Sequence, residues 1–157
     1  MATGTPATKL LTTAGVNFIE HEYSHDPNST SFGLEAAEKL GVAPNRVFKT
    51  LIANVDETFA VAIVPVSQQV SLKSLARTLG AKRATMADPV HAARLTGYVV
   101  GGISPIGQKR LLPTVIDQSA LDFETILVSG GRRGFDIELA PQDLAELLSA
   151  IFAEIAS

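Results

Sequence analysis

The sequence predicts a mixed α+β fold, in which a curved, barrel-like mixed β-sheet is surrounded by helices. Helical and β-rich segments follow one another without strict βαβ alternation, which favours a mixed sheet over a doubly wound one. The β-rich runs are short and numerous, as in a partly closed barrel. The 157 residues, of which 46% are hydrophobic, suffice for the core of one domain spanning residues 1–157.

The first quarter of the chain predicts a helix, a strand and a second helix. Thr5 caps the first helix, Pro6 occupies its first turn, and Gly15 ends it. The segments that follow are, in order, a strand, a polar loop and a short amphipathic helix stopped by glycine: Val16–Tyr23, Ser24–Ser31, and Leu34–Leu40 before Gly41.

The middle of the chain predicts a β-hairpin and two helices. Two β-rich runs, Val47–Val55 and Phe59–Pro65, are joined by a short polar turn. Ser71 caps a helix that ends at Gly80, and Asp88-Pro89 caps another that runs to Thr96 and stops at Gly97.

The last third predicts three strand-like runs and a final helix. The runs are Tyr98–Val100, Thr114–Ile116 and Thr125–Val128. Pro141 opens an amphipathic helix whose apolar face we expect to hold five residues: Leu144, Leu147, Leu148, Ile151 and Ile155.

Composition excludes several classes of protein. The chain has no cysteine, so it has no disulfide framework, cysteine-based zinc site or cysteine nucleophile. Residues 1–15 lack the pattern of a signal peptide, and no apolar run approaches the roughly 20 residues that span a bilayer. We therefore expect a cytoplasmic protein without a membrane partner. The net charge of −3 argues against broad non-specific binding of nucleic acid.

Two glycine-rich segments are the clearest candidates for a ligand site. The first contains Gly101 and Gly102 after a strand-like run and leads to Lys109. The second, residues 128–136, contains Arg132. Glycine lets the backbone approach a ligand closely, and the local positive charge suits one or a few phosphates.

Three familiar motifs are nearly but not correctly formed. Residues 102–109 resemble a Walker A loop, but the lysine comes one residue late and no helix follows. Ser104 lacks the glycine spacing of a nucleophile elbow, and no histidine follows it in the chain. His21 and His25 do not share a helix face, so hydrogen bonding is favoured over metal binding, and we predict no metal or cofactor.

A lysine within a mostly apolar strand adds to this set. Lys49 is costly to bury alone. It either points into a pocket toward an anion or an ester oxygen, or carries a solubility charge on an edge strand. Asp136 could orient Lys49 or bind a ligand amine, and Ser129 could donate a hydrogen bond.

Three sequence blocks resemble the YbaK/EbsC family of aminoacyl-tRNA deacylases. They are FKTL at 48–51, TGYVVGGISPIGQKR at 96–110 and VSGGRRGFDIEL at 128–139. The resemblance extends over essentially the whole chain and is greatest for the Cys-tRNA(Pro) deacylase branch. It implies the barrel-like fold of the editing insertion domain of prolyl-tRNA synthetase. It also implies trans-editing hydrolysis of mischarged tRNA at its 3′ acceptor end, and prolyl-tRNA synthetase as a partner.

The resemblance also implies a set of pocket residues, all present in this chain: Tyr23, Phe32, Lys49, Thr50, Gly101, Ser129 and Asp136. We expect Lys49, Gly101, Gly102 and Asp136 to act in catalysis, with the two glycine N–H groups stabilising an oxyanion. We expect Lys109 and Arg132 to bind substrate with the remaining pocket residues. Because the candidate loops hold no good protein nucleophile and no poised histidine base, the thiol of a substrate cysteine is expected to attack its own ester. The alternatives are editing of Ala-tRNA(Pro) and a non-catalytic tRNA- or nucleotide-binding module.

Overall fold

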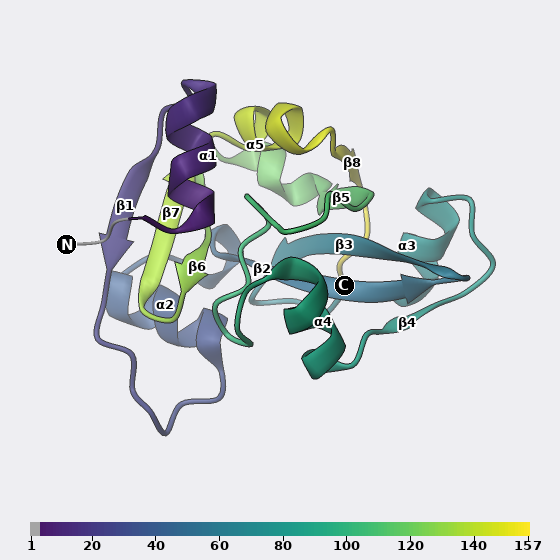
Figure 1. Ribbon diagram of the computed structural model, residues 1–157, viewed down its shortest axis with the longest axis horizontal. Helices are drawn as coiled ribbons and strands as arrows, with labels where there is room; N and C mark the ends of the chain where they lie inside the picture. Colours follow the sequence, from purple (N-terminus) through teal and green to yellow (C-terminus); the bar gives the residue numbers. More distant parts are fainter. Residues whose placement is uncertain (1–3) are drawn as a thin grey trace.

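The strands form two sheets in a computed structural model that describes residues 4–157 (Figure 1). The smaller sheet has the order β1-β7-β6 and is antiparallel. Its strands are β1 (Ile19–Glu22), β6 (Ile126–Arg132) and β7 (Phe135–Leu139). The larger sheet has the order β4-β2-β3-β5-β8 and is mixed, since β5 pairs in parallel with both its neighbours. Its strands are β2 (Phe48–Val55), β3 (Thr58–Pro65), β4 (Ala84–Met86), β5 (Thr114–Asp117) and β8 (Ile151–Ala153).

In the described part of the chain, one isolated bridge connects the two sheets. Val47, just before β2, pairs in parallel with Leu127 of β6. Within residues 4–157 the strands do not close into a barrel. The mixed α+β class predicted from the sequence is confirmed, with two sheets where one curved sheet was expected.

The helices begin and end at the residues that local physical chemistry favours. They are α1 (Pro6–Ala14), α2 (Phe32–Leu40), α3 (Leu72–Thr78), α4 (Pro89–Thr96) and α5 (Pro141–Leu148), with short 3₁₀ turns η1 (Pro44–Arg46) and η2 (Gln118–Asp122). The side chains of Thr5, Ser71 and Asp88 each accept a hydrogen bond from a backbone N–H of the first turn, as predicted. Glycine in the left-handed conformation ends α1, α2 and α4, which confirms the predicted stops.

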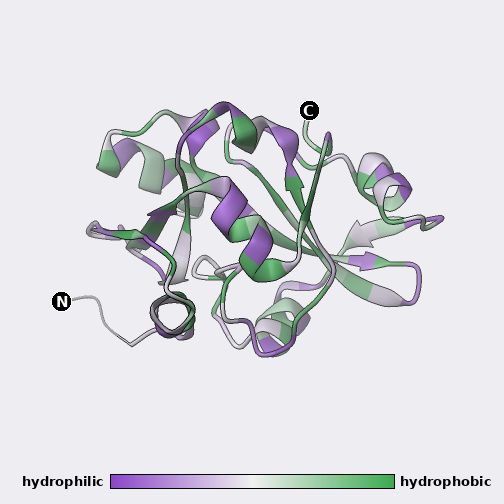
Figure 2. Cartoon of the chain, turned by 90° about the horizontal axis from the view of Figure 1, so that it is seen from above, coloured by the Kyte–Doolittle hydropathy of each residue, from purple (hydrophilic) through white to green (hydrophobic). Residues whose placement is uncertain are grey.

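The main core lies between the two sheets. Phe135, Ile137 and Val128 of the smaller sheet and Phe48, Ile52, Val61 and Ile63 of the larger one share a cluster with apolar residues of α1, α4 and α5. The apolar side of α3 packs on the opposite face of the larger sheet through Leu75. Figure 2 shows the strands of the β2–β3 hairpin as largely hydrophobic, with hydrophilic residues at its tip. This packing holds β2 rigidly at the centre of the molecule.

Three sequence-based expectations are wrong in detail. Tyr98–Val100 is not a strand: it forms a turn directly after α4, with Tyr98 buried and its hydroxyl donating to the carbonyl of Ile106. The glycine-rich segment after Val128 is no loop, because β6 continues to Arg132 through an irregularity after Ser129. The last helix ends at Leu148, since Ser149 adopts a left-handed conformation and Ile151 starts β8.

Within residues 4–157 no helix is both long and apolar enough to cross a membrane.

Candidate active site

A cavity of about 450 Å³ opens between β2, the start of α2, the start of α4 and the β6–β7 hairpin. Seven of the residues predicted from the sequence line it, although they come from four distant parts of the chain: Tyr23, Phe32, Lys49, Thr50, Gly101, Ser129 and Asp136. The remaining wall is largely apolar and includes Val66, Met86, Ala92 and Ile103. The fold therefore gathers a small polar group in an otherwise apolar pocket, as is typical of small-molecule sites.

The cavity lies beside an open edge of β2. On the side away from β3, β2 is paired with β4 only over Ala53–Val55, while the bridge to β6 is at Val47. The carbonyl of Ile52 accepts from Ala87 N–H on this side, at 3.0 Å. Because strand geometry repeats every two residues, the peptide groups of Thr50 point to the same side. The edge between Val47 and Ile52 is thus turned toward the cavity.

Thr50 presents a hydroxyl without a partner. Its Oγ1 is buried and, of the buried side-chain polar atoms in residues 4–157, is the one without a hydrogen bond. A buried polar group left unsatisfied costs about 1–3 kcal/mol. Such an atom in a cavity wall indicates a place where a ligand completes the hydrogen bonding.

Lys49 is half-buried in the cavity wall, next to Thr50. Burial lowers the pKa of its ammonium group. No carboxylate in the described part of the chain forms an ion pair with it. Of the two interpretations that the sequence left open, the position in the structure favours the pocket lysine over the edge-strand charge.

Asp136 is a buried carboxyl group that β7 contributes to the cavity wall. It lies on β7 between Ser129 of β6 and His21 of β1, and is 6% exposed. Burial raises its pKa to about 7, so the carboxyl group is poised to exchange a proton near neutral pH. The phenol of Tyr23 has its pKa raised to about 12, by its own burial first and then by the charge of Asp136.

Arg133, which was not among the predicted site residues, contacts two residues that line the cavity without lining it itself. Its guanidinium lies 5.0 Å from the ring centroid of Phe32, and its Nε donates to the carbonyl of Val100 at 2.8 Å. Gly101 follows with φ of +85°, and a Cβ there would lie 2.8 Å from the Phe32 ring. Arg133 thus connects the β6–β7 turn to the start of α2 and to the turn that contains Gly101. The doubled arginine after two glycines was the signal for it in the sequence.

Three predicted residues do not line the cavity. The N–H of Gly102 donates to the carbonyl of Val99 at 2.9 Å, so it is not free to bind an oxyanion as expected. Its lack of a side chain has a packing reason, since a Cβ would lie 2.8 Å from Arg132 Cα.

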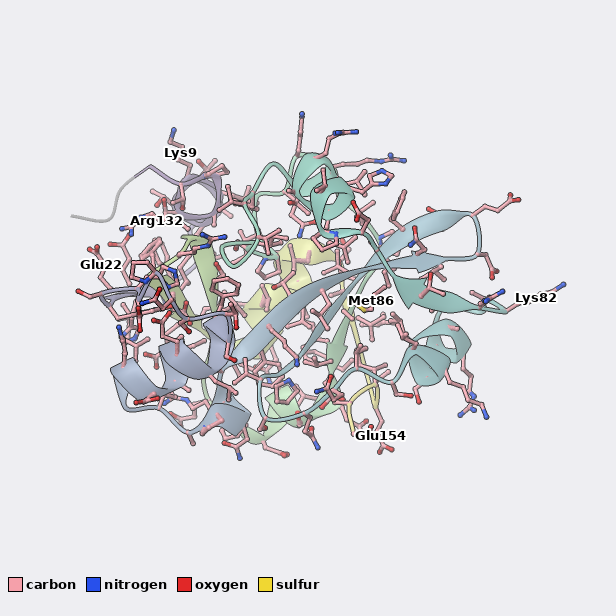
Figure 3. The ribbon with its side chains drawn as sticks, turned by 90° about the horizontal axis from the view of Figure 1, so that it is seen from below. Lys9, Glu22, Lys82, Met86, Arg132 and Glu154 are labelled. Atoms are coloured by element: carbon pink, nitrogen blue, oxygen red, sulfur yellow. The ribbon has the colours of Figure 1, made fainter. Side chains whose placement is uncertain are left out.

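Lys109 and Arg132 lie outside the cavity lining. Lys109 is exposed, and its backbone N–H donates to the carbonyl of Thr96, the last residue of α4. Arg132 donates to the carboxylate of Glu22 at 3.0 Å; both residues are labelled in Figure 3. The Arg132 guanidinium also lies over the ring of Phe135. Both side chains are near the outer surface, where they could contact only a large ligand.

The two histidines considered as metal ligands have hydrogen-bonded partners. His21 Nε2 bonds with Glu138, and His25 Nδ1 bonds with the buried Glu35, each at 2.7 Å. This confirms the hydrogen-bonding interpretation. Neither histidine is in the cavity wall, so neither is placed to act as a general base there.

The arrangement can bind an anionic or carbonyl group through Lys49 and a hydroxyl or amide through Thr50. The Asp136 carboxyl can take or give a proton. The cavity wall carries no thiol and no imidazole. Chemistry at this site therefore favours a substrate that brings its own nucleophile or an activated water.

Comparisons with known proteins agree on one family. Residues 26–147 match the model of the aminoacyl-tRNA editing domain. The chain is 37% identical over 152 residues to the "Putative Cys-tRNA(Pro)/Cys-tRNA(Cys) deacylase EbsC" of Enterococcus faecalis, covering 96% of this chain and 92% of that protein. It is 26% identical over 116 residues to a proline–tRNA ligase of Thermosipho melanesiensis, covering 74% of this chain but only 20% of the ligase.

Solved structures share the fold. One described as a "putative trans-editing enzyme for prolyl tRNA synthetase" superposes with a TM-score of 0.82 at 23% identity, covering 99% of each chain. A hypothetical protein superposes with a TM-score of 0.87 at 24% identity, covering 98% of this chain and all of that one. The family match spans every residue that lines the cavity except Tyr23. The chain belongs to the family of aminoacyl-tRNA editing domains.

Proposed function

We propose that this chain is a trans-editing hydrolase that deacylates mischarged tRNA in the cytoplasm, with Cys-tRNA(Pro) as its substrate. Residues 1–157 act as one deacylase domain. The observation that carries the proposal is the cavity in which Lys49, the unpartnered hydroxyl of Thr50 and Asp136 meet in a chain without cysteine. Family membership and the name of the 37% identical relative support the substrate class.

The reaction we propose uses the thiol of the substrate cysteine. The sulfur attacks the carbonyl carbon of the cysteine's own ester, the thiol gives up its proton, and the bond from that carbon to the ribose oxygen breaks. The ribose oxygen leaves with a proton, so tRNA is released with a free 3′ end. Water then opens the cyclic thioester and regenerates free cysteine, for a net consumption of one water. A cysteine thiol with pKa near 8.5 is a few per cent thiolate at neutral pH, which suffices for a strong nucleophile.

The cavity residues have separate tasks in this proposal. Lys49 binds a ribose or phosphate oxygen as a point charge, and its partial burial strengthens that attraction. Thr50 donates its free hydroxyl to the bound aminoacyl group. Asp136, with a pKa of about 7, binds the substrate amine or moves the thiol proton. Ser129 and Tyr23 orient the terminal ribose.

The oxyanion is stabilised by Gly101 in this proposal. Gly101 lines the cavity, whereas the N–H of Gly102 is bound to Val99. A preorganised backbone N–H at this position would stabilise the negative charge that develops on the ester carbonyl oxygen. Lys109 and Arg132 lie outside the cavity and have no part in the proposed reaction.

The chemistry also explains selectivity. A pocket distinguishes side chains that differ by one methylene by only about 1–3 kcal/mol. Requiring a thiol on the substrate rejects alanine and serine by reactivity rather than by size. The choice of tRNA is then made elsewhere, either on the outer surface of this chain or by prolyl-tRNA synthetase as a partner.

A deacylation assay with three substrates tests the proposal. We expect rapid release of cysteine from Cys-tRNA(Pro), slower or equal release from Cys-tRNA(Cys), and background release from Ala-tRNA(Pro). The variant Lys49→Ala should lose most of the activity while its circular dichroism spectrum and unfolding midpoint stay near wild type. Lys9→Ala, an exposed lysine on α1, is the matched control and should be fully active. Release from none of the three would favour a non-catalytic binding module, and full activity of Lys49→Ala would remove Lys49 from the site.

A further inference from the structure

Four basic side chains surround a second hollow, away from the cavity. Lys73, Arg77, Lys82 and Arg83 line it together with small apolar residues of α3 and the start of β4. All four side chains are exposed. No ion pair within residues 4–157 involves any of them. We refer to these four residues as the α3–β4 basic cluster.

Local structure fixes the α3–β4 basic cluster in place. Lys73 and Arg77 are four residues apart on α3 and therefore lie on one face of the helix. Lys82 and Arg83 follow the helix, and their backbone N–H groups donate to the carboxylate of Asp56 at 3.0–3.2 Å. Asp56 thus holds the segment through its backbone and leaves the two cationic side chains free.

This region is positively charged, whereas the chain as a whole is negatively charged. The protein carries a net charge of −3, yet the sequence from Thr58 to Ala87 contains the four basic residues and no Asp or Glu. The Asp56 carboxylate contacts the backbone of the cluster, so four cations face one anion and a positive excess remains. A local excess of positive charge on an acidic protein suits a contact with phosphates.

The α3–β4 basic cluster and the cavity lie along the same strand pair. Ala84, which lines the basic hollow, pairs with Val55 at the far end of β2, while Met86 of the same short strand lines the cavity. Lys49 is six residues from Val55, which corresponds to about 20 Å along the strand. Figure 3 shows Lys82 at the outer end of the molecule and Met86 nearer its middle.

We propose that the α3–β4 basic cluster binds the phosphate backbone of the tRNA acceptor stem while the 3′ end occupies the cavity. The inference rests on the proposed function, because that function puts the charged 3′ end beside Lys49. A stem that leaves the cavity along β2 and β4 reaches the cluster at the distance given by the strand. The contact is with phosphates, so it adds affinity without reading base sequence.

Two substrates distinguish tRNA binding at the α3–β4 basic cluster from ester hydrolysis in the cavity. One is Cys-tRNA(Pro); the other is a cysteinyl ester of the trinucleotide CCA, which fills the cavity but has no stem. The double variant Arg77→Gln/Lys82→Gln should hydrolyse the tRNA roughly tenfold less efficiently, measured as kcat/KM, at low salt. Its rate on the trinucleotide ester should equal that of wild type. The single variants Lys82→Gln and Lys9→Gln form the matched pair, since Lys9 is exposed at the opposite end of the molecule (Figure 3).

Binding of uncharged tRNA gives a second readout that needs no catalysis. The slope of log affinity against log salt concentration should be smaller in magnitude by about 2 for the double variant than for wild type. Equal efficiency of variant and wild type on tRNA, or an equal loss on both substrates, would overturn the inference. An acidic protein partner on this surface would leave both tRNA measurements unchanged, which also overturns it. If wild type hydrolysed neither ester, the proposed function would be wrong. The salt dependence of tRNA binding would still show whether the α3–β4 basic cluster contacts tRNA.

Discussion

The guanidinium of Arg133 lies over the ring of Phe32, with 5.0 Å between the guanidinium carbon and the ring centroid. The Nε of the same side chain donates to the carbonyl of Val100, so one residue contacts two residues that line the cavity. The contact joins the start of α2 to the turn between β6 and β7, which are about a hundred residues apart in the chain.

This contact predicts that Arg133→Ala makes Phe32 and Val100, which line the cavity, less firmly held. We expect kcat/KM for a cysteinyl ester to fall about fivefold to tenfold, and the unfolding free energy to fall by only about 0.5–1 kcal/mol, since Arg133 is exposed. Arg133→Lys should not restore activity, because an ammonium lacks both the planar face and the Nε donor. In a double-mutant cycle Phe32→Leu and Arg133→Ala should be non-additive. Additive effects would show that the two side chains act independently. Rescue by lysine would show that the positive charge alone matters.

Thr50→Val should separate ligand binding from stability. The buried Oγ1 has no partner in the protein, so removing it relieves a cost of about 1–3 kcal/mol that is partly offset by altered packing. We expect urea denaturation to give an unfolding free energy equal to or above that of wild type, with lower activity. Thr50→Ser keeps the hydroxyl and should keep most of the activity. A clearly destabilised but fully active Thr50→Val would contradict a ligand-binding hydroxyl.

Asp136 should make stability depend on pH in a direction opposite to that of most aspartates. In the unfolded chain its carboxyl ionises near pH 4, whereas burial in the fold raises the pKa to about 7. The folded protein therefore holds a proton that the unfolded chain releases between these values. The stabilising contribution is present below pH 4 and is lost as pH rises to about 7.

The variant Asp136→Asn measures this contribution. Asparagine does not titrate, so the variant lacks this pH dependence. Between pH 4 and pH 8 the unfolding free energy of wild type should therefore fall by roughly 2–4 kcal/mol relative to that of the variant. Urea denaturation at both pH values measures it, and deacylation at pH 8 should fall sharply. An unchanged difference at the two pH values would mean that Asp136 is already ionised in the fold.

Gly101 can be tested against another glycine with the same backbone conformation. Both Gly101 and Gly41 have positive φ, but an added Cβ would meet Phe32 and Arg133 only at Gly101, while at Gly41 it would meet nothing within 4 Å. Gly41→Ala should cost about 1 kcal/mol of stability and retain activity. Gly101→Ala should cost more and should abolish most deacylation. Equal activity of the two variants would argue against close approach of the substrate to Gly101.

Part of the cavity lining could be predicted from residue chemistry, and the rest came from the family resemblance. The cost of burying a lysine in an apolar strand drew attention to Lys49, whereas the resemblance, which extends over essentially the whole chain, supplied Tyr23 and Phe32. Helix caps were correct where side-chain chemistry alone decides them, as at Thr5 and Asp88. Such features depend on a few neighbouring residues.

The failures came where long-range packing decides. Ile151 looked helical by spacing, but its backbone pairs with Val115 of β5. Gly102 looked like an oxyanion donor, but a turn formed after α4 uses its N–H internally. Arg133 became part of the site only when the fold brought it onto Phe32. No local pattern contains those partners.

The most direct measurement compares two esters on the same tRNA. Wild-type protein is mixed with tRNA(Pro) charged with cysteine or with serine, which differ only in sulfur against oxygen, and release of the amino acid is followed over time. The proposed mechanism predicts fast release of cysteine and release of serine at the uncatalysed rate, with both tRNAs bound equally well. Equal rates of release would contradict attack by the substrate thiol and would require a nucleophile supplied from the cavity.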